Sequence, residues 1–255
     1  MAQSTADRRR ITGPEESSPQ IFDDVPDATS WQLGDPRRTR ERKDIRPIFL
    51  KTGLVSQANG SAYIETGRTK LACAVYGPRQ SKSTSYHESG KLNVEVKFTP
   101  FSGQIRKAPL KDVEDRSISS LIHQALLPSI RLDLLPKSVI DIFVTVIECD
   151  GSEGCAAAGA VACSAALANA GVEMFGMIAS MGDEIWLDPT DVESAAAIGS
   201  LLFTYMPALD AVTNVRQTGC MLPSQAVQAM KLCQERCKDI HQVVVQALLI
   251  SAKTQ

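Results

Sequence analysis

The feature that most constrains this chain is a helix-forming segment built almost entirely from small side chains. Nine of the fifteen residues from Ala156 to Ala170 are alanine. Just before it, the β-branched and nearly continuous run at residues 138–149 predicts a central strand. A glycine-containing turn at residues 150–154 joins the two. We therefore expect a strand, a tight turn, and a helix that another backbone or helix can approach closely.

Short strands are predicted on the N-terminal side of this unit. Residues 48–55, 61–66 and 70–76 are separated by glycine-containing turn sequences that suit tight hairpins. A polar insert follows at residues 79–91. Apolar and polar side chains then alternate from Leu92 to Phe98, which is typical of a strand with one buried face. We expect this strand to become the fourth in an antiparallel meander.

The remaining segments mix helices and strands. Apolar residues at helical spacing predict a helix within residues 113–131, which Pro128 should end or kink. A short helix is expected from Thr190 and a long final helix from about Pro223. Further strands are expected around residues 177–180, 185–187, 201–206 and 211–218. Grouped strands followed by interleaved strands and helices indicate an α+β fold, with a mixed sheet packed against helices.

The first 44 residues have a different composition from the rest. They are rich in Pro, Ser, Asp and Arg and show no apolar period, so we expect residues 1–44 to form a flexible tail and residues 45–255 the folded domain. A basic cluster lies where the two meet and is either a solvated charge run or a contact for an RNA backbone. Its members are Arg37, Arg38, Arg40, Arg42, Lys43 and Arg46.

Charge and cysteine content narrow the possible functions. The net charge of −2 excludes the global basic field of a stand-alone, non-specific nucleic-acid binder. Seven scattered cysteines without a secretory signal predict reduced thiols in a cytosolic or nuclear protein. The uncharged stretch 154–172 is too poor in large apolar residues for a membrane span, so we expect no membrane partner.

The last predicted helix carries Cys233, Cys237 and His241 at a spacing of four residues. Three ligands on consecutive turns span about 12 Å, too far to meet one zinc ion. We therefore expect these side chains to pack in the core, and we expect no metal or other cofactor. A thiol-dependent or zinc enzyme is the weakest of the functional alternatives.

The turn at residues 150–154 is the most informative candidate for chemistry. Free backbone N–H groups and the helix dipole point at such a turn, so it is a potential anion site. This segment, the turn and strand at residues 59–65, and Trp186, Leu187 and Asp188 resemble the RNase PH family of phosphorolytic 3′→5′ exoribonucleases. The resemblance spans about residues 45–250. It implies an RNase PH-like fold of the ribosomal protein S5 domain 2-like type.

Two departures from the active family pattern concern the predicted active site. The resemblance implies that a hydroxyl and an arginine hold the attacking phosphate, and here those positions fall on Glu153 and Gly154. It also implies a catalytic aspartate at Asp188 and a metal-binding aspartate six residues later, where this chain has Ser194. Asp191 and Glu193 are possible substitutes. A structural alternative is that Asp188 caps a helix and that residues 190–193 form a capping box.

A basic loop before the first predicted helix lies where members of the family present cations to RNA. Its residues Arg106, Lys107 and Lys111, together with Arg116 in the helix, are candidates for RNA-backbone contacts; a solvated loop is the alternative.

The runs at residues 8–17, 54–63 and 187–190 resemble a ring subunit of the RNA exosome within this family. This resemblance implies a non-catalytic subunit of a six-membered ring that surrounds a channel for single-stranded RNA. The implied protein partners are exosome component seven, as the heterodimer partner, and the cap subunit exosome component one. The implied location is the nucleus, nucleolus and cytoplasm. The alternative is an active phosphorolytic 3′→5′ exoribonuclease.

Overall fold

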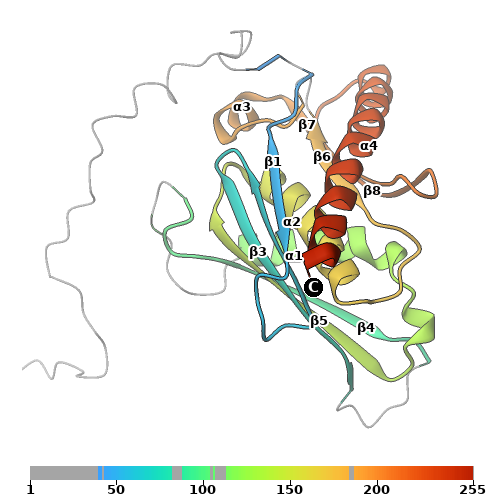
Figure 1. Ribbon diagram of the computed structural model, residues 1–255. Helices are drawn as coiled ribbons and strands as arrows, with labels where there is room; N and C mark the ends of the chain where they lie inside the picture. The colour runs from blue at the N-terminus through green and yellow to red at the C-terminus, as the bar shows by residue number, and fades with distance from the viewer. Residues whose placement is uncertain are drawn as a thin grey trace, which may run out of the picture. The chain divides into compact units, whose positions relative to one another are not determined.

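A five-stranded mixed sheet forms the first layer of the fold (Figure 1). The computed structural model describes residues 40–41, 43–81, 88–103, 106, 113–183 and 187–254. The strand order is β1-β2-β3-β5-β4, and only the β4–β5 pair is parallel. The strands are β1 (Ile48–Thr52), β2 (Gly60–Thr66), β3 (Thr69–Gln80), β4 (Lys91–Phe98) and β5 (Ser138–Glu148).

The predicted four-stranded meander is wrong in its last strand. β1, β2 and β3 do form two antiparallel hairpins, but β5 lies between β3 and β4. The chain leaves β4 through helix α1 (Val113–Leu126) and two 3₁₀ turns (Leu127–Ser129 and Leu132–Leu134) before it returns as β5. A parallel pair requires such a crossover. As predicted, β5 occupies an interior position of the sheet.

A second sheet contains three antiparallel strands, β6 (Ala179–Asp183), β7 (Gly199–Met206) and β8 (Ala211–Gly219), in that order. The short helix α3 (Asp191–Ala196) precedes β7. The long helix α4 (Pro223–Thr254) ends the described chain and packs against β1 and β6 (Figure 1). The strand expected at residues 185–187 falls largely outside the described residues.

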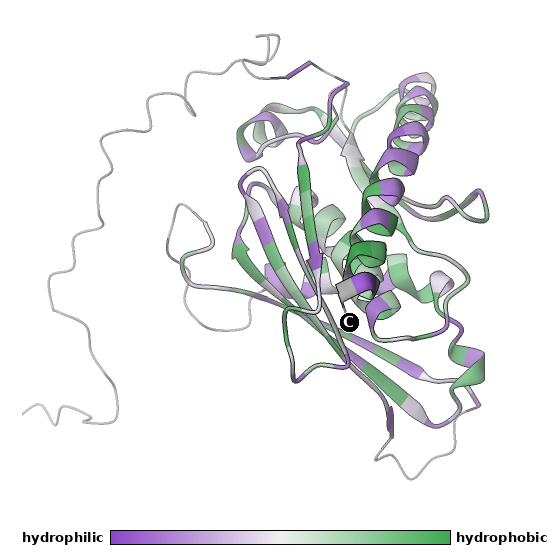
Figure 2. Ribbon diagram, viewed as in Figure 1, coloured by the Kyte–Doolittle hydropathy of each residue, from purple (hydrophilic) through white to green (hydrophobic). Residues whose placement is uncertain are grey.

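Helix α2 (Ser152–Asn169) forms the centre of the core. All thirteen residues from Cys155 to Leu167 are buried, because the helix contacts β2 and β3 on one side and β6 on another, with α1 also packed against it. Figure 2 shows hydrophobic colouring along α2, whereas α4 alternates between polar and apolar residues. The predicted close approach is confirmed: a Cβ atom added to Gly60 would lie 2.3 Å from the carbonyl oxygen of Ala166.

The apolar face of α4 follows the predicted helical stripe. Cys233 and Cys237 are fully buried in this face, as expected from packing, and His241 lies at its edge. Burial raises the pKa of Cys237 to about 12 and lowers the pKa of His241. The stripe is completed by Ala226, Ala229, Ile240 and Val244.

Candidate functional site

The junction between β5 and α2 is the predicted anion site. Gly151 is the N-cap of α2 with φ of +94°, a conformation that glycine adopts without steric cost, and no side chain caps the helix. Glu153 occupies the first turn. Its Oε1 accepts hydrogen bonds from the hydroxyls of Ser200 and Thr218, which face each other across β7 and β8. A carboxylate of the chain itself therefore lies at the helix N-terminus, where the dipole stabilises negative charge.

The second carboxylate oxygen, Oε2 of Glu153, is buried and has no hydrogen-bond partner among the described residues. At the next position, Gly154 supplies no side chain. A Cβ atom added there would lie 3.4 Å from Nη2 of Arg46, so the guanidinium of Arg46 lies beside this part of the helix backbone. No local sequence pattern predicts Arg46, Ser200 or Thr218 at the junction, because all three lie far from it along the chain.

Arg46 is the centre of a buried charge network. Its Nε and Nη2 donate to the two carboxylate oxygens of Asp188 at 2.8 and 2.5 Å, and its Nη1 donates to Oδ2 of Asp150 at 2.8 Å. The backbone N–H of Arg46 also donates to Asp188 at 3.1 Å. Only 8% of Arg46 is exposed, so this bidentate pair is shielded from solvent.

Arg40 adds a second cation to Asp188. Its Nη2 donates to the backbone carbonyl of Asp188 at 2.6 Å, and its Nη1 lies 3.3 Å from the carboxylate. Burial acts to raise the pKa of Asp188, but the hydrogen bonds and positive charges of Arg46 and Arg40 outweigh it, so the pKa is lowered. The basic cluster was predicted to be either a solvated charge run or a contact for an RNA backbone. Both alternatives are wrong for Arg40 and Arg46, because their side chains pair with carboxylates inside the domain.

The predicted capping role of Asp188 is also wrong. Helix α3 begins at Asp191, and its N-cap is Thr190, whose hydroxyl accepts from the backbone of Glu193. The Glu193 carboxylate accepts in return from the backbone N–H of Thr190 at 2.9 Å, so the predicted capping box is confirmed. Asp188 instead adopts φ of +53° and binds the arginines. Ser194 lies within α3 and donates its backbone N–H to Thr190.

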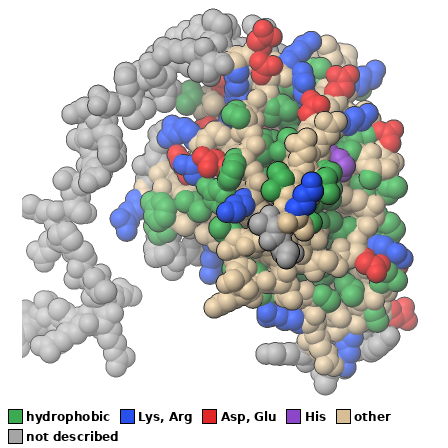
Figure 3. Space-filling view, in the orientation of Figure 1, with side chains coloured by type: hydrophobic (Ala, Val, Ile, Leu, Met, Phe, Trp, Pro, Cys, Tyr) green, Lys and Arg blue, Asp and Glu red, His purple; other side chains and the backbone are tan. Residues whose placement is uncertain are grey.

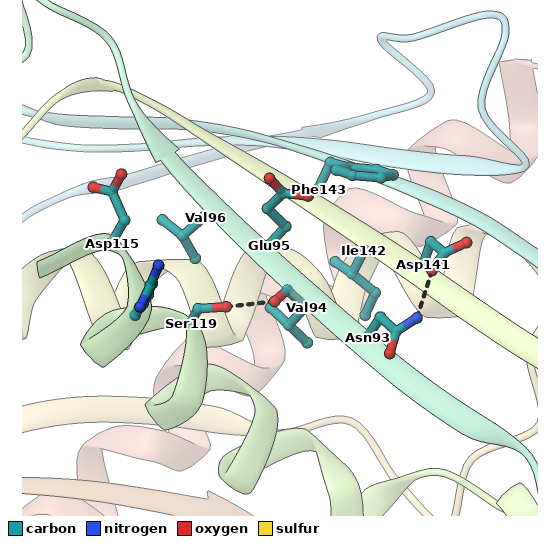
Figure 4. Close-up of a pocket in the computed structure, with 10 residues that line it drawn as sticks. Asn93, Val94, Glu95, Val96, Asp115, Ser119, Asp141, Ile142 and Phe143 are labelled. Atoms are coloured by element: carbon teal, nitrogen blue, oxygen red, sulfur yellow. Dashed lines mark hydrogen bonds between the residues drawn. The ribbon is translucent and has the colours of Figure 1, made fainter. Parts of the chain in front are cut away.

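The predicted RNA contacts are only partly described. Arg106 and Arg116 are exposed, whereas Lys107 and Lys111 lie outside the described residues. Arg116 lines a cavity of about 420 Å³ between α1 and the edge of the sheet (Figure 4). Three acidic residues line the same cavity: Glu95, Asp115 and Asp141. Arg116 therefore lies near three carboxylates, and its contact with an RNA backbone stays a prediction.

The wider surface has mixed charge. Figure 3 shows basic and acidic side chains interspersed with hydrophobic ones on the face in view. Within the described part of the chain, no group of three or more His, Cys, Asp or Glu side chains is placed to hold a metal ion. In the same residues, no helix combines the length and the apolar character needed to cross a membrane.

These elements define an RNase PH-like α+β domain, with a mixed sheet, a buried small-residue helix and a second sheet that meets the helix N-terminus. A family model described as "3′ exoribonuclease family, domain 1" matches residues 44–173, just over half of the chain. The chain belongs to this RNase PH family, as the sequence resemblance predicted.

Relatives align over most or nearly all of the chain. Exosome complex component mtr3 of Schizosaccharomyces pombe is 37% identical over 254 residues, which cover 96% of each protein. Exosome complex component MTR3 of Homo sapiens is 33% identical, covering 97% of this chain and 96% of the human protein. Exosome complex component Rrp41 of Pyrococcus horikoshii is 34% identical over 82% of this chain and 86% of its own length.

Two solved structures have the same fold. Rice (Oryza sativa) Rrp46 superimposes with a TM-score of 0.73 at 18% identity, covering 82% of this chain and 98% of the rice protein. A chain of the Archaeoglobus fulgidus exosome, solved with RNA bound to the active site, gives a TM-score of 0.72 at 15% identity, covering 80% and 90%. These matches confirm the expected RNase PH-like fold.

Proposed function

We propose that this chain is a non-catalytic ring subunit of the RNA exosome, of the MTR3 type. The near full-length similarity to two proteins named as exosome complex component MTR3 supports membership of the complex. The observation that carries the loss of catalysis is the Glu153 carboxylate in the first turn of α2, held by Ser200 and Thr218. It stands where the family resemblance implies that phosphate is bound.

Electrostatics at this turn oppose phosphorolysis. The reaction brings a phosphate dianion up to a phosphodiester that is already negative, so the site must supply positive charge. A carboxylate about 5 Å from a phosphate instead costs roughly 3 kcal/mol per pair of unit charges at an effective dielectric constant near 20. Gly154 adds no cation, and the guanidinium of Arg46 beside it already binds Asp150 and Asp188.

The residues considered as an altered catalytic site have structural partners. The lowered pKa of Asp188 leaves it without a proton to give to a leaving group, and both its oxygens accept hydrogen bonds from Arg46. Glu193 completes the capping box of α3. The backbone N–H of Asp191 donates to Asp150 at 3.2 Å, which ties α3 to the β5–α2 junction. These contacts favour a structural role over metal-assisted catalysis.

As a ring subunit, the chain would act through its surfaces. We propose as partners other RNase PH-like ring subunits, with exosome component seven in the heterodimer, and the cap subunit exosome component one. Single-stranded RNA passing through the ring would contact the basic loop of Arg106, Lys107 and Lys111 through its phosphates. The proposed locations are the nucleus, nucleolus and cytoplasm. Residues 1–44 would form a tail that precedes the domain at residues 45–255 in the chain, and Arg40 near the end of that tail binds Asp188 of the domain.

The test is a phosphorolysis assay on the chain with its heterodimer partner. Labelled single-stranded RNA, magnesium and inorganic phosphate are supplied, and released nucleoside diphosphates are measured. We expect none above a control that lacks phosphate. Nucleoside diphosphate that forms only when both phosphate and this chain are present would refute the proposal and establish the active exoribonuclease. Failure of the tagged chain to co-purify with RNase PH-like subunits would separately refute ring membership.

A further inference from the structure

The seven cysteines differ sharply in their access to solvent. Cys220 is exposed and Cys149 is half-buried, whereas the other five are at most 1% exposed. Cys149 follows β5 directly, and Cys155 lies in the first part of α2. Cys149 and Cys220 are therefore the two cysteines that meet solvent in the folded chain, whereas the other five are enclosed.

Cys149 is not isolated. Its Sγ lies 2.6 Å from Sγ of Cys155, whose thiol donates to it, and the Cys149 thiol donates in turn to the carbonyl oxygen of Gly151 at 3.3 Å. The two sulfur atoms are therefore already in direct contact, as the formation of a disulfide requires. A second pair, Cys73 and Cys163, has its sulfur atoms 3.5 Å apart inside the core. The structure thus contains one accessible pair and one inaccessible pair.

We propose that Cys149 and Cys155 form a peroxide-sensitive dithiol that closes to a disulfide at the junction of β5 and α2. Cys149 is the attacking residue because solvent reaches it. Cys155 is the resolving residue because it is buried against Cys149.

The chemistry balances with hydrogen peroxide as the oxidant. The Cys149 thiolate attacks one peroxide oxygen, the O–O bond breaks, and hydroxide leaves to give a sulfenic acid. Sulfur of Cys155 then attacks sulfur of Cys149, the S–O bond breaks, and the Cys155 proton leaves with the hydroxyl as water. Two thiols lose two electrons in total, and the peroxide gains them. The hydrogen bond to Cys149 and burial raise the pKa of Cys155, so its proton leaves only as its sulfur attacks and the departing hydroxide takes it up.

The new bond would constrain a specific turn. Residues 150–154 would be enclosed in a small covalent ring, which contains Asp150, Gly151 and Glu153. Asp150 accepts from Arg46 and from the backbone of Asp191, so the ring would also limit the movement of the Arg46 network relative to α2. Reduction by a small thiol would reopen it.

The test treats the full chain, in the assembly with which it purifies, with hydrogen peroxide and then blocks free thiols with N-ethylmaleimide. A glutamate-specific protease cuts after Glu148, Glu153 and Glu173, which places Cys149 and Cys155 in the separate peptides 149–153 and 154–173. We expect mass spectrometry to find these peptides joined, with the loss of two hydrogens, and separated again after reduction. The disulfide between peptides 149–153 and 154–173 should form at least about tenfold faster than any disulfide that involves peptide 66–88, which carries Cys73.

Two variants make the result specific. In Cys155→Ala, which suits the composition of α2, peroxide should leave a sulfenic acid on Cys149 that dimedone traps, with no linked peptide. In Cys73→Ala, the link between Cys149 and Cys155 should form as in the wild type. The proposal is overturned if Cys149 stays free while Cys220 is oxidised. It is also overturned if Cys149 proceeds to sulfinic acid beside a free Cys155, or if peptide 66–88 links as quickly.

Discussion

Replacing Arg46 with alanine tests whether its buried network stabilises the fold. The substitution removes three side-chain hydrogen bonds to carboxylates and leaves Asp150 and Asp188 without their shared partner. Breaking a buried ion pair by removing one member costs about 3–5 kcal/mol. Asp188 keeps Arg40 and a backbone N–H, and its side chain is 13% exposed, so we expect a loss of about 2–4 kcal/mol.

The measurement is the free energy of unfolding from urea denaturation of the full chain. Arg68→Ala is the matched control, because Arg68 also pairs with an acid, Glu148, but its side chain is 67% exposed. An exposed pair of this kind contributes about 0–1 kcal/mol. Arg46→Lys keeps the positive charge but cannot form the bidentate hydrogen bond. Its loss of unfolding free energy should therefore fall between the losses of the two alanine variants.

The effect of Arg46→Ala should also depend on pH. The pKa of Asp188 is lower in the folded chain than in the unfolded chain, where it is about 3.9. The stabilisation from its charge is therefore fully present above that unfolded value and is lost as the pH falls through the lowered folded value. The difference in unfolding free energy between the wild type and Arg46→Ala should be constant near neutral pH and should become smaller in acid. A neutral-pH loss no larger than that of Arg68→Ala would refute the reasoning.

Gly60→Ala should destabilise by at least about 3 kcal/mol in thermal unfolding, because its Cβ would overlap the backbone of Ala166, whereas Gly182→Ala meets only an ordinary contact and should cost about 1 kcal/mol or less. Thr190→Ala removes one half of the capping box and should cost about 1 kcal/mol in urea denaturation; no change would contradict the cap. Replacing all three cations of the basic loop with alanine in a reconstituted ring should lower the salt dependence of single-stranded RNA binding by a slope of about 2, equally for all sequences. An unchanged slope would make the loop a solvated surface.

Local signals in the sequence predicted most individual elements. The alanine-rich helix, the hairpins and the long C-terminal helix were predictable because each depends on periodicity or turn chemistry within a short segment. The position of β4 was not, because alternation shows that a strand has a buried face but not which strand it pairs with. β5, some forty residues further along the chain, takes the place beside β3.

The site was predictable only in outline. The glycine turn and Glu153 could be identified from neighbouring residues and from the family resemblance. The partners of Arg46 could not, because Asp150 and Asp188 lie 104 and 142 residues away along the chain. Nothing in the basic cluster distinguishes Arg40 and Arg46 from arginines that remain in solvent. Thr190, and not Asp188, caps α3, while Asp188 binds Arg40 and Arg46. The local sequence could not show this, because both arginines lie far from Asp188 along the chain.

The central position of α2 has a consequence for how the domain opens. Because one helix supplies the packing surface for both sheets, neither sheet can lose its structure without exposing that helix to water. The domain should therefore lack a partly unfolded state in which one sheet remains native. Amide protons of the middle turns of α2 should exchange with solvent only when the whole domain unfolds. Amides of α3, which lies outside this packing, should exchange through smaller local openings.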